Sequence, residues 1–453
     1  MAGGRRLVSV LGMGYSRRQM LGIVPVAAVS AAWPGVSAAA RPEGGSVLIR
    51  NVHIFDGRRM LDGRRSVLIR DGLIARIGDL APEGVAVVDG RGGTLLPGLI
   101  DSHVHTFEGS SADALRFGVT TELEMFGEPG QLAAAKRQRR SRKQVTAADL
   151  WSAGNGVTVP GGHPVRPGYE FPRVLPDTDL DSFVADRLQE GSDYLKFVYE
   201  PGDPPDRPLP SLTLAQVTAT IAAAHRRGRL AVGHVEKLKL YVEAVRAGAD
   251  GIVHVPYNAV AGAAEVEMIR RSGSFAVPTL SVVDWGLGAK SLLADDRITP
   301  WLSPTQEYLL SQEPPERPGR PDLLGIASAN VRRFHAAGIP VLAGADAPVR
   351  ANVSGASLLT ELEHLVRAGL TPAEALTAAT AAPARHLRLA DRGRITPGRR
   401  ADLILTSADP TRDITNLRTL HTIWKNGYQV DRTPPAEVRR SSASMTVGQT
   451  STS

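Results

Sequence analysis

Two histidines one residue apart, His103 and His105, end an apolar run in the sequence PGLIDSHVHTF. Side chains at positions i and i+2 of a β-strand point to the same face, so both imidazoles can reach one point. The residues LLPGLI just before them are mostly apolar, as in a strand buried inside a parallel sheet. Two imidazoles that converge at the end of a buried strand are typical of a metal site, whose further ligands must come from other segments.

Four more residues of kinds that bind metals lie within or at the end of short apolar segments: Lys196 in DYLKFVYE, His234 in LAVGHV, His254 in GIVHVP and Asp346 in VLAGADAP. Each has an ordinary structural explanation when taken alone. A core histidine can be satisfied by hydrogen bonds, a buried lysine by a salt bridge, and an aspartate can cap a helix. Their common position at strand ends favours a single shared metal site.

The segments that carry these residues alternate with amphipathic stretches. Strands are expected at residues 95–105, 119–126, 149–154, 194–199, 230–235, 251–256, 275–282 and 340–347, and the clearest helices at 214–227 and 240–247. Eight strand–helix units in about 290 residues predict an α/β fold, a (β/α)8 TIM-type barrel over residues 95–390, with a doubly wound sheet as the alternative. Catalytic groups of such a barrel lie at the carboxyl ends of its strands, where all six candidate residues occur.

Short strands with turns flank the barrel segment on both sides. Asp56-Gly57 and Asp71-Gly72 are hairpin signals between alternating runs, and a similar β-rich stretch returns near the C-terminus. We therefore expect a small β-sandwich domain built from residues 41–94 and 391–432. The Ser/Thr-rich tail at 433–453 shows no periodicity and is expected to be disordered.

The first 40 residues have the features of a targeting segment. Arg17 and Arg18 precede a moderately apolar stretch, and small residues suited to cleavage follow at 36–38. The twin arginines followed by Met20 and Leu21 resemble a bacterial twin-arginine export signal, with an ordinary secretory signal as the alternative. We expect an exported protein, periplasmic or secreted. Because the apolar stretch is short and broken by Gly and Pro, no stable membrane anchor is expected.

Composition excludes several kinds of chemistry. The chain has no cysteine, so disulfides, thiolate catalysis and cysteine-bound zinc are excluded. The formal net charge is +7, but arginines and acidic residues are interspersed, and no nucleic-acid partner is expected. The one basic run, KRQRRSRK at 136–143, is interpreted as a solvated helix end or loop.

Over residues 47–430 the chain resembles the metal-dependent amidohydrolase superfamily. The resemblance is carried most specifically by PGLIDSHVH and GRITPGRRADLILTSADP. Within that superfamily it is similar to the imidazolonepropionase-related and prolidase-like branch, which includes Xaa-Pro dipeptidases, carboxypeptidase-type dipeptidases and ochratoxin-hydrolysing amidohydrolases. The resemblance implies two divalent metal ions with these ligands: His103, His105 and Asp346 for the more buried ion, His234 and His254 for the second, and a carbamylated Lys196 that bridges both. Zinc is the expected metal, and Mn, Co or Ni suit the same ligands.

The resemblance also implies a reaction. A metal-bridging hydroxide would attack the carbonyl of an amide in a small molecule such as a dipeptide or N-acyl amino acid, with Asp346 as general base and then general acid. Lys196 disfavours the single-metal deaminases of the superfamily. Two alternatives stay open: an esterase, lactonase or phosphotriesterase that uses the same site, and a non-catalytic exported protein that only binds metal.

Three residues are candidates for substrate contacts. His163 lies in the glycine-rich loop GNGVTVPGGHPV after the third strand, where it would bind the scissile carbonyl or a substrate carboxylate. Tyr199 and Tyr257 come just after Lys196 and His254. The expected partner is a small-molecule substrate, and a homo-oligomer is expected by analogy with the family alone.

Overall fold

The computed structural model describes residues 46–81, 84–164, 169–202, 208–284, 286–312, 322–349 and 351–434. All of these lie in one compact unit, residues 42–453. The expected targeting segment at 1–40 lies outside the described residues, as does all but the start of the expected tail at 433–453. No helix in the described ranges has the length and apolar character needed to cross a membrane.

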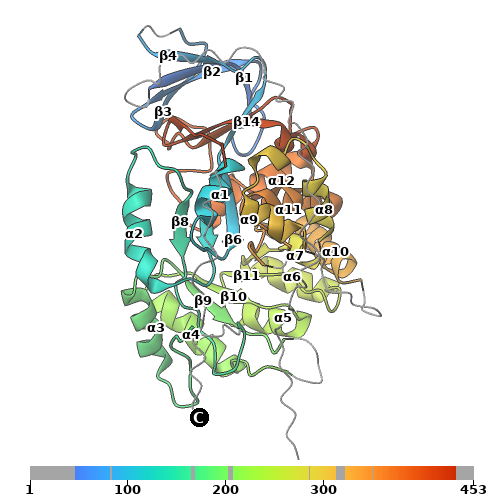
Figure 1. Ribbon diagram of the computed structural model, residues 1–453. Coiled ribbons are helices and arrows are strands. Elements are labelled where there is room, and N and C mark those ends of the chain that lie inside the picture. Colours follow the sequence, from blue (N-terminus) through green and yellow to red (C-terminus); the bar gives the residue numbers. More distant parts are fainter. Residues whose placement is uncertain are drawn as a thin grey trace, which may run out of the picture. The chain divides into compact units, whose positions relative to one another are not determined.

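Strands from both ends of this unit form one mixed sheet of eight strands (Figure 1). Its order is β15-β14-β13-β5-β1-β2-β3, with β4 beside β1. The strands are β1 (Val47–Ile54), β2 (Arg65–Arg70), β3 (Leu73–Gly78), β4 (Ala86–Asp89), β5 (Thr94–Pro97), β13 (Leu403–Thr406), β14 (Leu420–Lys425) and β15 (Tyr428–Gln429). Ile49, Ile69 and Trp424 belong to one buried cluster, so the two chain ends share a core. The predicted turn at Asp71-Gly72 is confirmed, since both residues have the positive φ that a tight hairpin needs.

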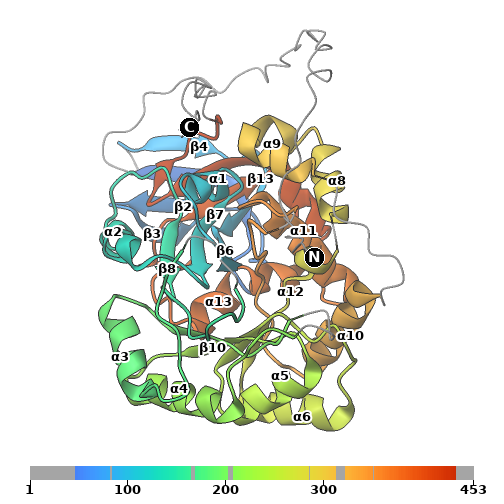
Figure 2. The same ribbon diagram turned by 60° about the horizontal axis from the view of Figure 1, so that its bottom comes forward.

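The middle of the chain forms two parallel sheets. One holds β6 (Leu99–Val104), β7 (Val119–Glu124) and β8 (Asp149–Ser152); the other holds β9 (Leu195–Val198), β10 (Ala231–His234), β11 (Gly251–Val253) and β12 (Phe275–Val277). Within each sheet, neighbouring strands follow one another in sequence without the reversal that defines a doubly wound sheet. Helices α3 (Leu180–Gln189), α4 (Leu214–Arg226), α5 (Leu238–Arg246) and α6 (Ala263–Ser272) cover the outside of the second sheet (Figure 2).

Single bridges join the two parallel sheets. Val157 pairs with Phe197 of β9, Ala276 of β12 pairs with Val341, and Ala347 pairs with Val104 of β6. Residues 340–347, predicted as the eighth strand, make only such isolated bridges. The predicted barrel is therefore seen in part: the strands stand in barrel order, but regular pairing stops at the joins, and the described residues contain no continuous closed sheet.

Local chemistry explains where elements begin and end. Helix α4 starts at a capping box in which Thr213 and Gln216 bond each other's backbone, which confirms the helix predicted at 214–227. The strand predicted at 275–282 is wrong beyond Val277, because Pro278 lacks an N–H and Thr279 adopts a φ of 53°. The strand predicted at 95–105 divides at Gly98, where any Cβ would lie 2.3 Å from the Thr120 hydroxyl.

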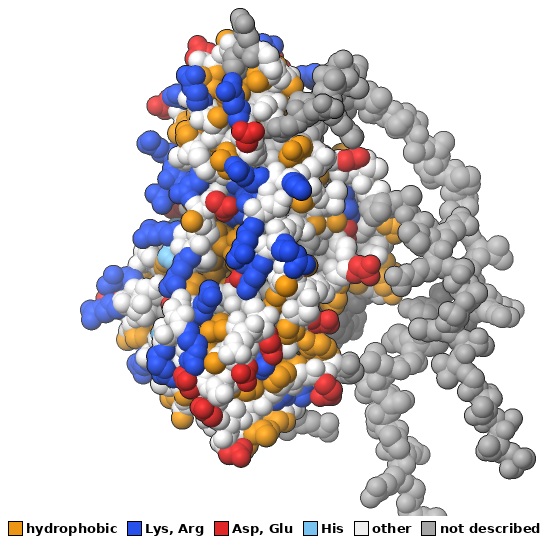
Figure 3. Space-filling model, turned by 90° about the vertical axis from the view of Figure 1, so that its left-hand side faces the viewer, with side chains coloured by type: hydrophobic (Ala, Val, Ile, Leu, Met, Phe, Trp, Pro, Cys, Tyr) orange, Lys and Arg blue, Asp and Glu red, His pale blue; other side chains and the backbone are white. Residues whose placement is uncertain are grey.

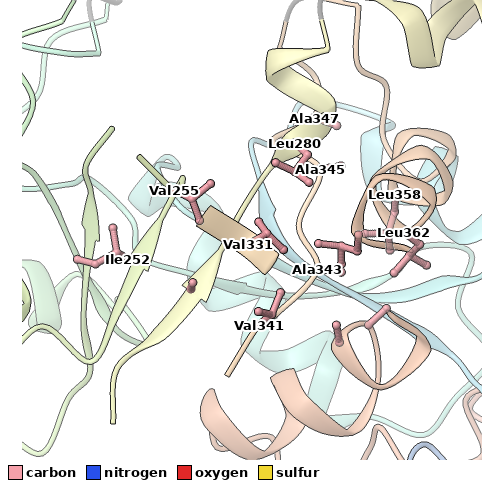
Figure 4. Packing of buried hydrophobic residues seen from close by; sticks show 14 of the residues in the cluster. Ile252, Val255, Leu280, Val331, Val341, Ala343, Ala345, Ala347, Leu358 and Leu362 are labelled. Atoms are coloured by element: carbon pink, nitrogen blue, oxygen red, sulfur yellow. The ribbon is translucent and has the colours of Figure 1, made fainter. Parts of the chain in front are cut away.

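The other helices complete the layer around the parallel sheets. They are α1 (Ser110–Arg116), α2 (Pro129–Arg140), α7 (Leu280–Val283), α8 (Leu287–Leu293), α9 (Pro304–Leu310), α10 (Leu323–Ala336), α11 (Ala356–Arg367), α12 (Pro372–Ala378) and α13 (Ala381–His386), with 3-10 turns at Thr299–Trp301 and Ile414–Thr419. Figure 4 shows Val331 of α10 and Leu362 of α11 beside Val341 and Ala343. Segment 340–347 is thus held by side-chain packing as well as by its bridges.

A buried charge network connects the parallel sheet β6-β7-β8 to the sheet formed by the chain ends. The Lys425 amine, on β14, lies 2.8 Å from Asp149 of β8 and 3.0 Å from Asp402. Arg392 contacts the same Asp149 oxygen at 2.8 Å. The Lys425 and Asp149 side chains are fully buried, so each charge depends on its partners for stabilisation.

Lys and Arg side chains gather on the side of the molecule that carries α2 (Figure 3). The basic run predicted as a helix end is confirmed as one, since α2 stops at Arg140. Lys136 and Arg139 face Asp193, whereas Arg137 and Arg140 are exposed to solvent. Cations in the last turn of a helix also interact favourably with its dipole.

A buried carboxyl on β7 makes stability depend on pH. Burial, with a further contribution from nearby Glu124, raises the pKa of Glu122 to about 7. Between pH 4.5 and 7 the unfolded chain has released this proton while the folded chain retains it, so this group makes the protein less stable as pH rises. We expect the loss of unfolding free energy over this range to be about 3 kcal/mol smaller in Glu122→Gln than in the wild type. Urea unfolding at pH 4.5 and 7.5 measures this difference. Equal losses of unfolding free energy in the variant and the wild type would show that Glu122 titrates normally.

Candidate metal centre

Five of the six predicted ligands form two adjacent groups of metal-binding atoms. In the first, the Nε2 atoms of His103 and His105 lie 3.2 and 3.1 Å from Oδ1 of Asp346. In the second, Nε2 of His254 lies 3.0 Å from Nδ1 of His234. The groups are neighbours, because the His103 and His254 ring centroids are 5.2 Å apart. The first group has the atoms and spacing to hold one ion, and so does the second together with Glu236.

Glu236 completes the second group, and sequence reasoning gave it no role as a ligand. Its Oε1 lies 3.8 Å from Nε2 of His234, and it is grouped with His234 and His254 as a possible ligand. The hydroxyl of Tyr257 donates to Oε2 of Glu236, which fixes the carboxylate's orientation. In the sequence, the only sign that Glu236 belongs to the site is its position two residues after His234. Tyr257, predicted as a substrate contact, thus lies at the centre and contacts a group that can bind metal.

Lys196 is the sixth predicted ligand. Its side chain is buried, and its amine has no hydrogen-bond partner in the described part of the chain. Burial lowers its pKa to about 7, although the charge of Asp346 opposes this shift. A neutral amine is the form that reacts with carbon dioxide, so the environment suits the predicted carbamylation. The unpartnered amine also fits a centre completed by bound ions, because burying a polar group without a partner is costly.

The protonation states suit metal binding. Burial lowers the pKa values of His103 and His234 well below the usual range and that of His254 to about 3, so all three imidazoles are neutral near pH 7. Burial alone would raise the pKa of Asp346, but His103 and His105 lower it below its usual value. Neutral imidazoles beside an ionised carboxylate are a typical ligand set for a divalent metal.

Some of the ligands face the metal centre because side chains alternate regularly along their strand, and others face it because their backbone is irregular. Lys196 and His234 lie two residues after buried Tyr194 and Val232, as expected for one face of a strand. His254 instead directly follows Val253 of the same buried cluster, and its φ of 63° changes the direction of its side chain. Thr279 Oγ1 lies 2.6 Å from Nδ1 of His254 and orients the ring. Sequence reasoning missed Thr279, because its role depends on a backbone angle.

The two remaining predicted substrate contacts differ in their surroundings. The His163 ring stacks on His234 with centroids 4.5 Å apart and planes inclined by 26°, so the loop after β8 reaches the metal centre. Tyr199 donates its hydroxyl to Glu243 of α5 at 2.8 Å, and a substrate would have to compete with that bond. Of these two, the geometry favours His163 as the substrate contact.

Comparisons with known proteins identify the family of the chain. The amidohydrolase family model matches residues 165–430. An imidazolonepropionase from Anaeromyxobacter dehalogenans is 29% identical over 344 residues, which is 71% of this chain and 77% of that protein. The structure of a putative prolidase from Bifidobacterium longum has a TM-score of 0.69 at 24% identity, covering 86% of this chain and 96% of that one. A Xaa-Pro dipeptidase with bound methionine gives 0.68 at 22% identity, covering 85% of this chain and 100% of that one. At these identities the two structures establish similarity of fold.

The unpartnered amine of Lys196 predicts an unusual stability effect. In protein stripped of metal and carbon dioxide, Lys196→Met should be about 1–3 kcal/mol more stable than the wild type, because it removes a buried polar group that lacks a partner. Lys425→Met is the matched control. It should cost about 3 kcal/mol, because it leaves Asp402 and Asp149 with one cation fewer. Urea unfolding of the three proteins tests this, and a Lys196→Met variant destabilised as much as Lys425→Met would contradict it.

Proposed function

Because the chain belongs to the amidohydrolase family, in the branch of imidazolonepropionase-like and prolidase-like proteins, we propose that it hydrolyses amide bonds in small molecules such as dipeptides or N-acyl amino acids. Family membership makes it a hydrolase that acts on carbon–nitrogen bonds. The observation that supports the finer proposal is the buried amine of Lys196, which has no hydrogen-bond partner among the described residues. It is close enough to Asp346, His103 and His254 to interact with them electrostatically. A lysine in this position favours a two-metal site over a single-metal one.

The proposed cofactors are two divalent ions. His103, His105 and Asp346 would hold one, His234 and His254 the other, and carbamylated Lys196 both. Zinc is the first choice because imidazole and carboxylate ligands suit it, while Mn, Co or Ni accept the same set. When bound, such ions lower the pKa of a water molecule and polarise a carbonyl.

The chain's own residues supply the proton transfers and the orientation. Asp346 is ionised, so its carboxylate can accept a proton from water and deliver it to the departing nitrogen. The balanced outcome is one carboxylic acid and one amine from each amide and water. His163, whose ring stacks on His234, would donate a hydrogen bond to the substrate's carbonyl oxygen or carboxylate. Tyr257 holds Glu236 at the edge of the centre.

We also propose that the protein is exported. The support is the sequence alone: the twin arginines at 17 and 18, the apolar stretch and the small residues at 36–38. Export of an already folded protein suits an enzyme that takes up its metal before it crosses a membrane.

A substrate panel tests the proposed activity. Full-length protein, loaded with zinc in bicarbonate buffer, is incubated with dipeptides, Xaa-Pro peptides, N-acyl amino acids, lactones, esters and phosphotriesters, and products are followed by mass spectrometry. We expect acid and amine from at least one amide, with a rate at least about 100-fold lower in Lys196→Met.

Each of the other outcomes of this substrate panel would change the proposed function. Turnover of esters, lactones or phosphotriesters without any amide would place the same site in that class. Stoichiometric metal binding with no turnover of any compound would indicate a binding protein. Full activity in Lys196→Met would rule out the proposed bridge.

A further inference from the structure

Strand β6, which contains His103 and ends just before His105, has an irregularity at its C-terminal end. Asp101 pairs with Glu122 of β7, but the next pair is Val104 with Glu124, so three steps on β6 match two on β7. The other edge is irregular too. Ser102 and His105 donate their N–H groups to the carbonyls of Ala343 and Ala347 at 2.9 and 2.7 Å. These donors are three residues apart instead of the regular two, and their acceptors are four apart. One extra residue in a strand of this kind is a β-bulge, which redirects side chains.

The bulge determines which side chains face the metal centre. Ile100 belongs to the buried cluster that also contains Val232 and Val253 of β10 and β11. Regular alternation would place Ser102 on the same face as Ile100. The extra residue shifts the phase, so that His103 faces the centre instead and approaches His254.

The bulge also displaces two backbone N–H groups from regular ladder bonds. The N–H groups of His103 and Ala345 both donate to Oδ1 of Asp101, at 3.1 and 3.0 Å. Asp101 is completely buried, and a buried N–H requires an acceptor. One carboxylate oxygen thus joins the strand that carries His103 to the segment that carries Asp346.

The two segments approach each other too closely to tolerate much displacement. A Cβ at Gly344 would lie 2.8 Å from the His103 nitrogen. Asp346 donates its own N–H to the His103 carbonyl at 2.8 Å. The Ala345 carbonyl accepts from Asn352 at 2.8 Å, which holds this segment from the other side. The distance between the His103 ring and the Asp346 carboxylate therefore follows from these contacts together with the two hydrogen bonds that Asp101 accepts.

We propose that Asp101 is a positioning residue of the metal centre: its Oδ1 accepts the two N–H groups displaced by the bulge and so sets the spacing of His103 and Asp346, two ligands of one ion. The inference rests on the proposed use of metal. It assigns Asp101 no contact with metal or substrate. Its function is that of a hydrogen-bond acceptor, which an amide oxygen can also fill.

Metal titration of full-length protein tests the proposal. Metal-free wild type, Asp101→Ala and Asp101→Asn are titrated with Co²⁺ in bicarbonate buffer, by calorimetry and by the visible absorption of the bound ion. We expect Asp101→Ala to bind one of two equivalents about 10–100-fold more weakly and to alter the visible spectrum of the bound Co²⁺. The reason is that His103 and Asp346 lose the hydrogen bonds that position them. Asp101→Asn should bind both equivalents within about 3-fold of the wild type, because its amide oxygen replaces the acceptor.

Glu122→Ala is the matched control. It removes a carboxyl that is equally buried and pairs with Asp101 across the strands, yet it should leave both affinities and the spectrum unchanged. The unfolding temperature of each variant separates a general loss of stability from a specific loss of metal.

Three results would decide against the proposal or its premise. Wild-type affinity for both equivalents in a folded Asp101→Ala would overturn it. A loss in Asp101→Asn comparable to that in Asp101→Ala would overturn it as well, since the charge and not the acceptor would then matter. If Asp101→Ala does not fold, the comparison of Asp101→Asn with the wild type still tests the proposal, because a large loss of metal affinity in Asp101→Asn would overturn it. A wild type that binds no metal would instead refute the proposed function.

Discussion

The buried amine of Lys425 links parts of the chain that are nearly 300 residues apart. It lies on β14, near the C-terminal end of the fold, and contacts Asp149 at the start of β8 and Asp402 just before β13. Arg392 contacts the same Asp149 oxygen. Removing one member of a buried network leaves the others without compensation, which typically costs about 3–5 kcal/mol. Sheet β6-β7-β8, which supplies His103 and His105, is therefore anchored by charges from the opposite end of the chain.

The metal centre has the opposite electrostatic character. Burial keeps the imidazoles of His103, His234 and His254 neutral near pH 7, and the carboxylate of Asp346 is ionised. Where the Lys425 network satisfies its charges internally, the centre leaves the Lys196 amine without a hydrogen-bond partner among the described residues, which suits a site that binds ions. Buried polar atoms without partners cost stability, and the anchored sheet β6-β7-β8 helps to keep the site in place despite this cost.

Much of this arrangement follows from the sequence because strand alternation is a local rule. Lys196 and His234 lie at alternating positions of buried strands, and the neighbouring apolar residues indicate which face they share. Segment 340–347 was predicted as a strand, but its residues pair only at isolated bridges, and side-chain packing also holds it in place. Glu236 and Thr279 were missed as parts of the site. A contact such as Thr279 with His254 depends on backbone angles that tertiary packing imposes.

Several backbone irregularities in the parallel strands and in the segments that follow them lie at the metal centre. His254, Thr279 and Asp346 all have φ between 52° and 63°, a region in which residues other than glycine are uncommon. The bulge in β6 adds a fourth irregularity next to His103. Strained backbone of this kind costs of order 1–3 kcal/mol per residue and persists only where the surrounding structure imposes it. In a regular barrel strand, side chains alternate between the interior and the helices. Bringing His103 and His254 to one point therefore requires departures from alternation, and hydrogen bonds such as those of Asp101 and Thr279 stabilise them.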